Sequence, residues 1–208
     1  PPQMTLESQW CSDDWIPVLY RFAAGYFLIL TRDLISVSDP EFQHILGNIR
    51  EKYPDCQIGI SSVYYLPENL CHTLRESVYA SAIQQIEQSY GPIPVPEWTF
   101  YDSIGVYRAL IPLRDTEAVQ TYMQRIIEPI IEFDAKNQSI LLDTLLNFIS
   151  CKGNLHLLTQ KMNQHENTLR YRLGKISEIT ALNYRVSSNY EELAFAARIF
   201  LLSRIRIL

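Results

Sequence analysis

The chain has 208 residues, of which 47% are hydrophobic, 20% are charged and 12% are aromatic, and its formal net charge at pH 7 is −5. This composition is typical of a folded globular chain and excludes collagen-like and intrinsically disordered sequences. The length favours two modest domains, each able to bury its own core. The apolar runs are far shorter than the about 20 residues of a membrane-spanning helix, and no basic segment followed by an apolar one stands at the start. We therefore expect a cytoplasmic protein with no membrane partner.

Charge is distributed unevenly along the chain. Residues 138–208 contain nine Lys and Arg against five Asp and Glu, a net charge of +4, which leaves nine against eighteen, or −9, for residues 1–137. A basic part attracts nucleic-acid phosphates and an acidic part repels them. The asymmetry favours a sensory or assembly domain joined to a DNA-reading domain, although an ordinary solvated basic face would give the same count.

The four cysteines, Cys11, Cys56, Cys71 and Cys151, show none of the C-x-x-C spacing of a zinc site. A chain of this length has enough core to fold without disulfides. We therefore expect four reduced thiols, no metal and no cofactor.

The first part of the chain alternates strands with helices. Two β-rich runs at residues 16–22 and 26–31, separated by Ala23-Ala24-Gly25, predict a hairpin. Asp39-Pro40 predicts the start of a helix, because aspartate caps a helix and proline suits its first turn. The apolar residues of this helix recur at helical spacing, at Phe42, Ile45, Leu46, Ile49 and Tyr53.

Further elements are expected before residue 134. They are a strand over residues 57–64, a helix from Pro67 to Gly91, a strand over 98–101, a short helix over 104–110 and a longer helix over 116–128. Pro129 should break or kink the last helix. Strands covered by helices in this order predict an α+β sheet domain over residues 1–133.

The remainder lacks strand-like alternation and predicts an all-α domain over residues 134–208. Apolar spacing marks four helices, over residues 141–149, 154–162, 169–179 and 193–202. Lys152-Gly153 should end the first and Asn154 should cap the second. Ser188 with Glu191 three residues later has the spacing of a capping box for the fourth.

The segment over residues 153–173 reads as two short helices around a tight polar turn, which is the arrangement of a DNA-binding helix-turn-helix. Leu169, Leu173 and Ile176 should point inward. Their neighbours then face solvent or a partner, and Gly174 would let DNA approach closely. The candidate DNA-binding residues are His165, Glu166, Asn167, Thr168, Arg170, Tyr171, Arg172 and Lys175.

These side chains suit contacts with duplex DNA. Arg170 can bind a phosphate or fork onto guanine, Asn167 can pair with adenine, and Thr168 can contact phosphate or a thymine methyl group. Spacing alone leaves open the alternative that this is the ordinary polar face of an amphipathic helix in a small bundle.

The same segment resembles the C-terminal helix-turn-helix of the purine-catabolism and sugar-diacid regulators, the PucR and CdaR type. The likeness rests on Gly153-Asn154-Leu155, on residues 165–173, on Ile176-Ser177-Glu178-Ile179-Thr180 and on the apolar helix at residues 193–202. Residues 167–170 with Leu173 are also similar to the recognition helix of the Fis nucleoid protein. The resemblance implies a bacterial transcription regulator that binds double-stranded DNA as a homodimer.

One residue departs from that family pattern. Glu166 stands where the family usually has a basic residue, which lowers the expected affinity for DNA. An interaction of Glu166 with the positive N-terminal end of its helix is favoured over recognition of a cytosine amino group.

The front hairpin is similar in frame to the R-Y-G-G-D-E-F hairpin of diguanylate cyclases, and Ile58-Gly59-Ile60-Ser61 resembles their closing strand. Ala23-Ala24-Gly25-Tyr26 replaces G-G-D-E and removes both carboxylates that would hold the metal ions. The resemblance therefore implies a degenerate GGDEF-like domain over residues 1–133 and no enzyme. Such a domain often precedes the helix-turn-helix in the same regulator family.

Other polar residues carry no catalytic pattern. His44, His72 and His156 are expected to be structural, and His165 either caps its helix or contacts a phosphate. The alternative to a DNA-binding regulator is a ligand-sensing or dimerisation module with weak or no independent DNA binding. The short segment before the hairpin suggests a domain truncated at its N-terminus, with any small-molecule effector sensed by a domain upstream.

Overall fold

The computed structural model describes residues 16–22, 25–31, 38–64, 69–91 and 96–204. Over these residues the chain is mostly helical and has two small sheets of two strands each. In chain order the elements are β1 (Ile16–Phe22), β2 (Gly25–Thr31), α1 (Pro40–Lys52), β3 (Gly59–Ile60), α2 (Leu70–Tyr90), β4 (Thr99–Phe100), the 3-10 turn η3 (Tyr101–Ser103), α3 (Tyr107–Leu110), the 3-10 turn η4 (Ile111–Leu113), α4 (Glu117–Asn137), α5 (Leu141–Ser150), α6 (Leu155–Met162), α7 (Glu166–Thr180) and α8 (Ser187–Ser203).

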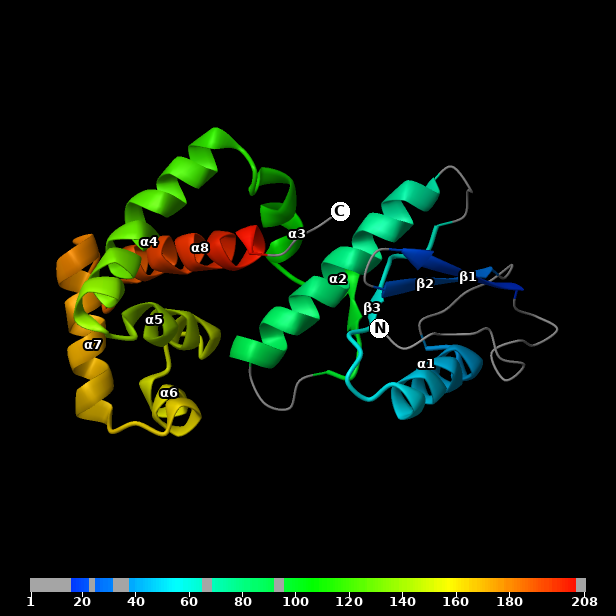
Figure 1. Cartoon of the computed structure of the whole chain (residues 1–208), viewed down its shortest axis with the longest axis horizontal. Helices are drawn as coiled ribbons and strands as arrows, with labels where there is room; N and C mark the ends of the chain where they lie inside the picture. Colours follow the sequence, from blue (N-terminus) through cyan, green and yellow to red (C-terminus); the bar gives the residue numbers. More distant parts are fainter. Residues whose placement is uncertain (1–15, 23–24, 32–37, 65–68, 92–95, 205–208) are drawn as a thin grey trace.

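The helices α4 to α8 form a bundle at one end of the molecule, and α1 with the β1–β2 hairpin lies at the other (Figure 1). Helix α2 runs between these two ends. One continuous hydrophobic cluster joins α2 to the bundle, with Ile83, Ile127, Leu145, Leu169 and Leu193 among its fully buried members. The bundle therefore shares its core with a helix of the front part.

The predicted hairpin is confirmed. β1 and β2 pair antiparallel, with Leu19 opposite Leu28 and Phe22 opposite Gly25. Gly25, expected in the connection, is the first residue of β2. Ala23 and Ala24 lie outside the described residues.

Helix α1 is also confirmed, with the expected cap. The Oδ1 atom of Asp39 accepts a hydrogen bond from the backbone N–H of Glu41 at 3.0 Å, and Pro40 occupies the first turn. Phe42 and Leu46 pack against side chains of the β3–β4 region, which places α1 over this small sheet.

Strands β3 and β4 pair in parallel but are shorter than predicted. Gly59 lies opposite Thr99 and Ile60 opposite Phe100. The flanking backbone groups bond to side chains of α2 instead: the N–H of Ile58 donates to Oε1 of Gln84 at 2.7 Å, and the N–H of Ser62 donates to Oε2 of Glu76 at 2.9 Å. Among the described residues no sheet has more than two strands, so the sheet is smaller than the sequence suggested.

Glycine is needed at position 59 because β3 passes very close to α2. A Cβ atom added at Gly59 would collide with the backbone of Ser77 and Ser81. This close approach lets the buried amide of Gln84 reach both Ile58 and, through Nε2 at 2.9 Å, the carbonyl of Pro96.

Of the break or kink expected at Pro129, the break was wrong. Helix α4 continues through Pro129 to Asn137 and ends at Gln138, which has a left-handed backbone conformation (φ 50°). Ile126, Ile127 and Ile130 are buried on both sides of the proline. Their burial offsets the cost of the missing N–H. The division suggested between residues 133 and 134 lies inside this helix.

The last helices follow the predicted order, with one correction. Helix α8 begins at Ser187 with Val186 at the capping position, and no side-chain hydrogen bond caps it. The capping box expected at Ser188 and Glu191 was therefore wrong, because Ser188 already lies within the helix. In the described part of the chain no helix is long and apolar enough to cross a membrane.

Candidate nucleic-acid interface

Helices α6 and α7 meet at a tight polar turn, as the sequence predicted. Oδ1 of Asn154 accepts from the N–H of Leu157 at 3.1 Å and so caps α6. After Met162 the chain turns at Asn163, whose left-handed conformation (φ 48°) ends α6. His165 caps α7, with Nδ1 accepting from the N–H of Asn167 at 3.2 Å. Of the two expectations for His165, the cap is the one present in the structure.

The second helix, α7, is held by one buried stripe. Leu169, Leu173 and Ile176 are fully buried and belong to the core shared with α4 and α5. This fixes the outward direction of the rest of the helix. The exposed predicted residues are His165, Glu166, Asn167, Thr168, Arg170 and Tyr171.

Tyr171 is the most prominent of these residues, with 72% of its surface exposed. An exposed tyrosine offers a large amphipathic contact area with a polar tip, which suits recognition of a partner. One turn further on, an added Cβ at Gly174 would meet no atom within 4 Å. The surface beside Tyr171 is therefore open.

Glu166 and Arg170 form an ion pair one turn apart on α7. Oε1 of Glu166 accepts from Nε of Arg170 at 2.7 Å and lies 2.5 Å from its Nη2 atom. This hydrogen bond, with smaller effects from the charge of Glu166 and from the hydroxyl of Tyr184, raises the pKa of Arg170. Glu166 also lies in the first turn, where a negative charge suits the helix dipole.

Arg172 and Lys175 are less exposed than the other candidates. Lys175 pairs with Oε2 of Glu178 at 2.7 Å, and its ammonium lies 5.6 Å from the centre of the Phe133 ring. Arg172 is half-buried, and its Nη1 atom is buried with no hydrogen-bond partner in the structure. Its position, three residues after Leu169, places it near the buried stripe. The structure thus does not bring Arg172 onto the exposed face.

Sequence reasoning missed Tyr184 and Arg185, in the connection between α7 and α8. The ring of Tyr184 packs edge-to-face on Phe148 with 5.7 Å between ring centres. Its hydroxyl accepts from Nε of Arg185 at 3.1 Å. Only the fold brings this connection back beside α7, so no local sequence signal could have indicated it.

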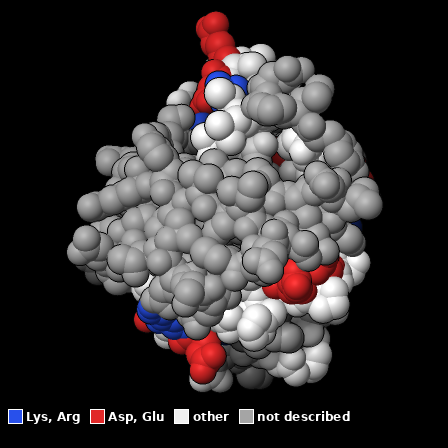
Figure 2. Space-filling view, turned by 90° about the vertical axis from the view of Figure 1, so that its right-hand side faces the viewer, with Lys and Arg blue, Asp and Glu red and all other residues white. Residues whose placement is uncertain are grey.

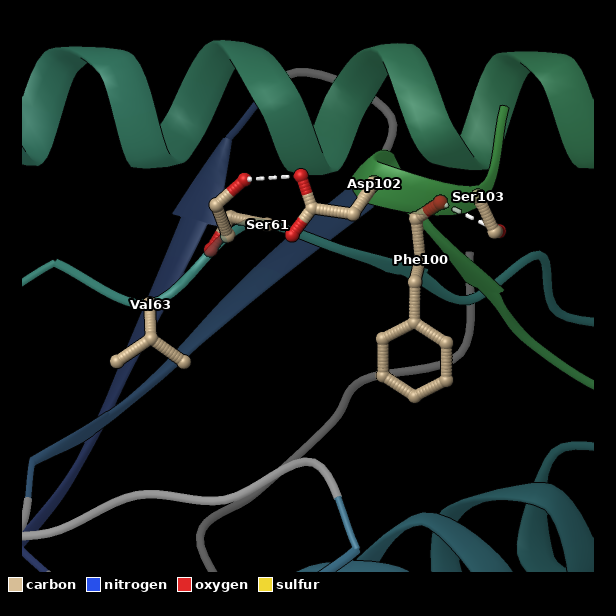
Figure 3. A pocket seen from close by; sticks show the side chains of 6 residues that line it. Ser61, Val63, Phe100, Asp102 and Ser103 are labelled. Carbon is tan, nitrogen blue, oxygen red and sulfur yellow. Dashed lines mark hydrogen bonds between the residues drawn. The ribbon is translucent and has the colours of Figure 1, made fainter. Parts of the chain in front are cut away.

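Among the described residues of the front part, a shallow hollow lies at the carboxyl ends of β3 and β4 (Figure 3). Its lining is formed by Ser61, Ser62, Val63, Phe100, Asp102 and Ser103. Asp102 is already engaged, since its Oδ1 atom accepts from the hydroxyl of Ser62 at 3.2 Å and pairs with Arg108 at 3.0 Å. Among the described residues no group of three or more His, Cys, Asp or Glu could hold a metal ion.

Figure 2 shows the end of the molecule that carries α1 and the hairpin. Where this face is formed by described residues, the Lys and Arg side chains lie in small groups beside acidic ones.

A pair of short helices with a buried stripe and an exposed polar second helix defines the class of helix-turn-helix DNA-binding domains. Residues 141–199 match the family model of the PucR C-terminal helix-turn-helix domain. These residues span α5 to most of α8, and thus include the whole candidate interface.

Two curated proteins are also similar to the chain. It is 22% identical over 176 residues, 77% of this chain and 41% of the relative, to a protein of Bacillus subtilis described as "DNA-binding transcriptional activator AdeR". It is 39% identical over 57 residues, 27% of this chain and 16% of the relative, to an uncharacterized protein of Haemophilus influenzae. The chain thus spans less than half the length of these relatives. Together the matches show that residues 141–199 are similar to a PucR-type helix-turn-helix domain and that the chain is similar to part of a protein described as a DNA-binding transcriptional activator.

Proposed function

We propose that this chain regulates transcription by binding duplex DNA with the N-terminal half of α7. The observation that carries the proposal is the exposed group Asn167, Thr168, Arg170 and Tyr171 on the second helix of a PucR-type helix-turn-helix. Arg170 contacts guanine or a phosphate, Asn167 pairs with adenine, and Thr168 contacts a phosphate or a thymine methyl group. His165 contributes by fixing the start of the helix, whereas Glu166 pairs with Arg170 in the free chain and its charge opposes phosphate binding.

The remaining predicted contacts have different roles in this proposal. Lys175 adds positive charge at the side of the interface, whereas Arg172 acts mainly through its position between α7 and the core. The chain acts as a homodimer, because a single short recognition helix contacts too few bases for high specificity. A dimer would place two α7 helices in successive major grooves.

The front region, residues 1–133, is proposed to be a degenerate GGDEF-like regulatory or assembly domain. The order hairpin, helix, strand, helix, strand, from β1 to β4, supports this assignment. Without the two hairpin carboxylates the domain would not cyclise nucleotides, and any effector would be sensed elsewhere. Incubation with GTP and magnesium tests this point, and a cyclic dinucleotide product would overturn it.

The main test is binding of fluorescent duplex DNA, taken from upstream of the gene for this chain, by wild type and by Arg170→Ala. We expect salt-dependent binding by wild type and at least about a tenfold loss in the variant, the size of a good arginine contact with a base. Arg75→Ala, which removes an exposed arginine from α2, is the matched control and should bind like wild type.

The outcome separates this proposal from its alternative. Absence of salt-dependent binding by wild type would favour a ligand-sensing or dimerisation module. Equal binding by wild type and Arg170→Ala would remove α7 from the interface.

A further inference from the structure

The connection between α7 and α8 is built to present its side chains rigidly. The backbone N–H of Tyr184 donates to the hydroxyl of Ser177 at 3.2 Å, which fastens the connection along α7. Phe148 supports the ring of Tyr184 from the core side. The N–H of Arg185 donates to Oδ1 of Asn183 at 3.0 Å, so the backbone beside Tyr184 is also fixed.

Arg185 is held in place on this support but keeps its charge exposed. Its guanidinium lies 5.3 Å from the centre of the Tyr184 ring, and its Nε atom donates to the Tyr184 hydroxyl. Among the described residues no carboxylate pairs with Arg185. Holding an arginine on a ring without neutralising it is an arrangement suited to an anion.

The connection that carries Arg185 lies beside α7. Ser177, whose hydroxyl accepts from the N–H of Tyr184, lies two turns after Arg170 on the same side of the helix. Arg185 itself is outside the recognition helix.

We propose that Arg185 is a further anchor for the DNA backbone, which binds a phosphate beside the recognition helix. This inference rests on the proposed function. A phosphate is favoured over a base edge because Arg185 lies at the side of α7, whereas the bases meet its exposed N-terminal half. The guanidinium group of Arg185 supplies the paired N–H donors that a phosphate accepts.

Titration of DNA binding against salt concentration tests the proposal in the full chain. Each phosphate contact contributes about −0.9 to the slope of log K against log [salt]. We expect Arg185→Ala to reduce the slope by about one and to weaken binding by about fivefold to tenfold at 0.1 M salt. The loss should be equal on specific DNA and on DNA of scrambled sequence, because a phosphate contact carries no sequence information.

Two further variants serve as comparisons: one alters the support of Arg185 but keeps its charge, and the other removes a positive charge far from Arg185. Tyr184→Phe keeps the ring on Phe148 but removes the hydroxyl, so it should weaken binding less than Arg185→Ala and preserve the slope. Arg75→Ala should change neither quantity. An unchanged slope in Arg185→Ala, or a loss confined to specific DNA, would overturn the inference while wild type still binds. Failure of wild type itself to bind would instead overturn the proposed function.

Discussion

Oε1 of Glu166 lies 2.7 Å from Nε and 2.5 Å from Nη2 of Arg170, so the arginine best placed to contact DNA is held by a carboxylate in the free chain. Both side chains are about half exposed, and an exposed pair of this kind contributes little to folding, on the order of 0.2–1 kcal/mol. Its effect on DNA binding is larger. The carboxylate repels nearby phosphates, and Arg170 must exchange Glu166 for its new partner.

We therefore expect Glu166→Gln to tighten DNA binding by about threefold to tenfold at low salt, because one charge repelled by DNA is removed. The free energy of unfolding should change by less than about 1 kcal/mol. Fluorescence anisotropy with duplex DNA measures the first quantity and urea unfolding the second. Glu51→Gln, on the exposed side of α1, is the control for net charge. Weaker binding by Glu166→Gln would show instead that Glu166 contacts a base, such as a cytosine amino group.

Gly174 offers a second test of how closely DNA approaches α7. An added Cβ meets nothing within 4 Å in the free chain, so Gly174→Ala should stabilise the helix by roughly 0.5–1 kcal/mol. The same methyl group should weaken DNA binding if the DNA backbone passes over this position. Gly47→Ala in α1, where an added Cβ also meets nothing, should stabilise folding without affecting DNA. A Gly174→Ala variant that binds DNA as well as wild type would place the DNA further along Tyr171 and Asn167.

The helices of the C-terminal part could be predicted from sequence because their signals are local. The spacing of apolar residues predicted that Leu169, Leu173 and Ile176 are buried. Asn154, as a capping residue, predicted the start of α6 from the first turn alone. The lengths of β3 and β4 depend instead on Gln84 and Glu76, which reach back from α2 to the neighbouring backbone groups. Such partners are distant in sequence and leave no periodic pattern.

Two further differences have the same origin. Pro129 predicted a break by its local chemistry, but burial of the isoleucines around it keeps α4 continuous. Arg172 is half-buried, with its Nη1 atom buried, whereas Arg185 is exposed in a connection that lies beside α7. In each case a tertiary contact, rather than the local sequence, decides where the residue lies.

The hydrogen bond made by Tyr122 leads us to expect a loss of stability at alkaline pH. Its hydroxyl donates to Oε2 of Glu192 at 2.6 Å and so connects α4 to α8. Burial and then this hydrogen bond raise the pKa of Tyr122 from 10.0 to about 12. Because the folded-state pKa is raised, the stabilisation is fully present below pH 10 and is lost as the pH rises through 12.

Tyr122→Phe should lower the free energy of unfolding at pH 8 by about 1 kcal/mol and make its fall between pH 10 and 12 less steep. Urea unfolding across this range measures both effects. Tyr64, whose hydrogen bond to Glu76 raises its pKa to about 12, adds a separate contribution, so Tyr64→Phe is the comparison. If the free energy of unfolding fell equally steeply between pH 10 and 12 in Tyr122→Phe and in wild type, the hydrogen bond to Glu192 would not be stabilising the neutral form of Tyr122.

Lys161 links the helix-turn-helix to the front part of the chain. From α6 its ammonium donates to the carbonyl of Tyr90, to that of Gly91 at 3.0 Å and to the hydroxyl of Ser150 at 3.3 Å. The first two carbonyls end α2, where a positive charge suits the helix dipole. Burial lowers the pKa of Lys161. The first helix of the DNA-binding unit is thus fastened to the C-terminal end of α2.

Lys161→Met keeps an apolar stem of similar length but leaves both carbonyls without this donor. We expect the free energy of unfolding to fall by about 1–3 kcal/mol, the cost of unsatisfied buried polar groups. Amide exchange should also become faster over residues 87–91, because the end of α2 loses its connection to α6. Lys152→Met, at an exposed lysine between α5 and α6, is the matched control and should leave exchange in α2 unchanged. If exchange at the end of α2 were equally slow in Lys161→Met, the shared hydrophobic core alone would hold the two parts together, and the lysine would have no part in joining them.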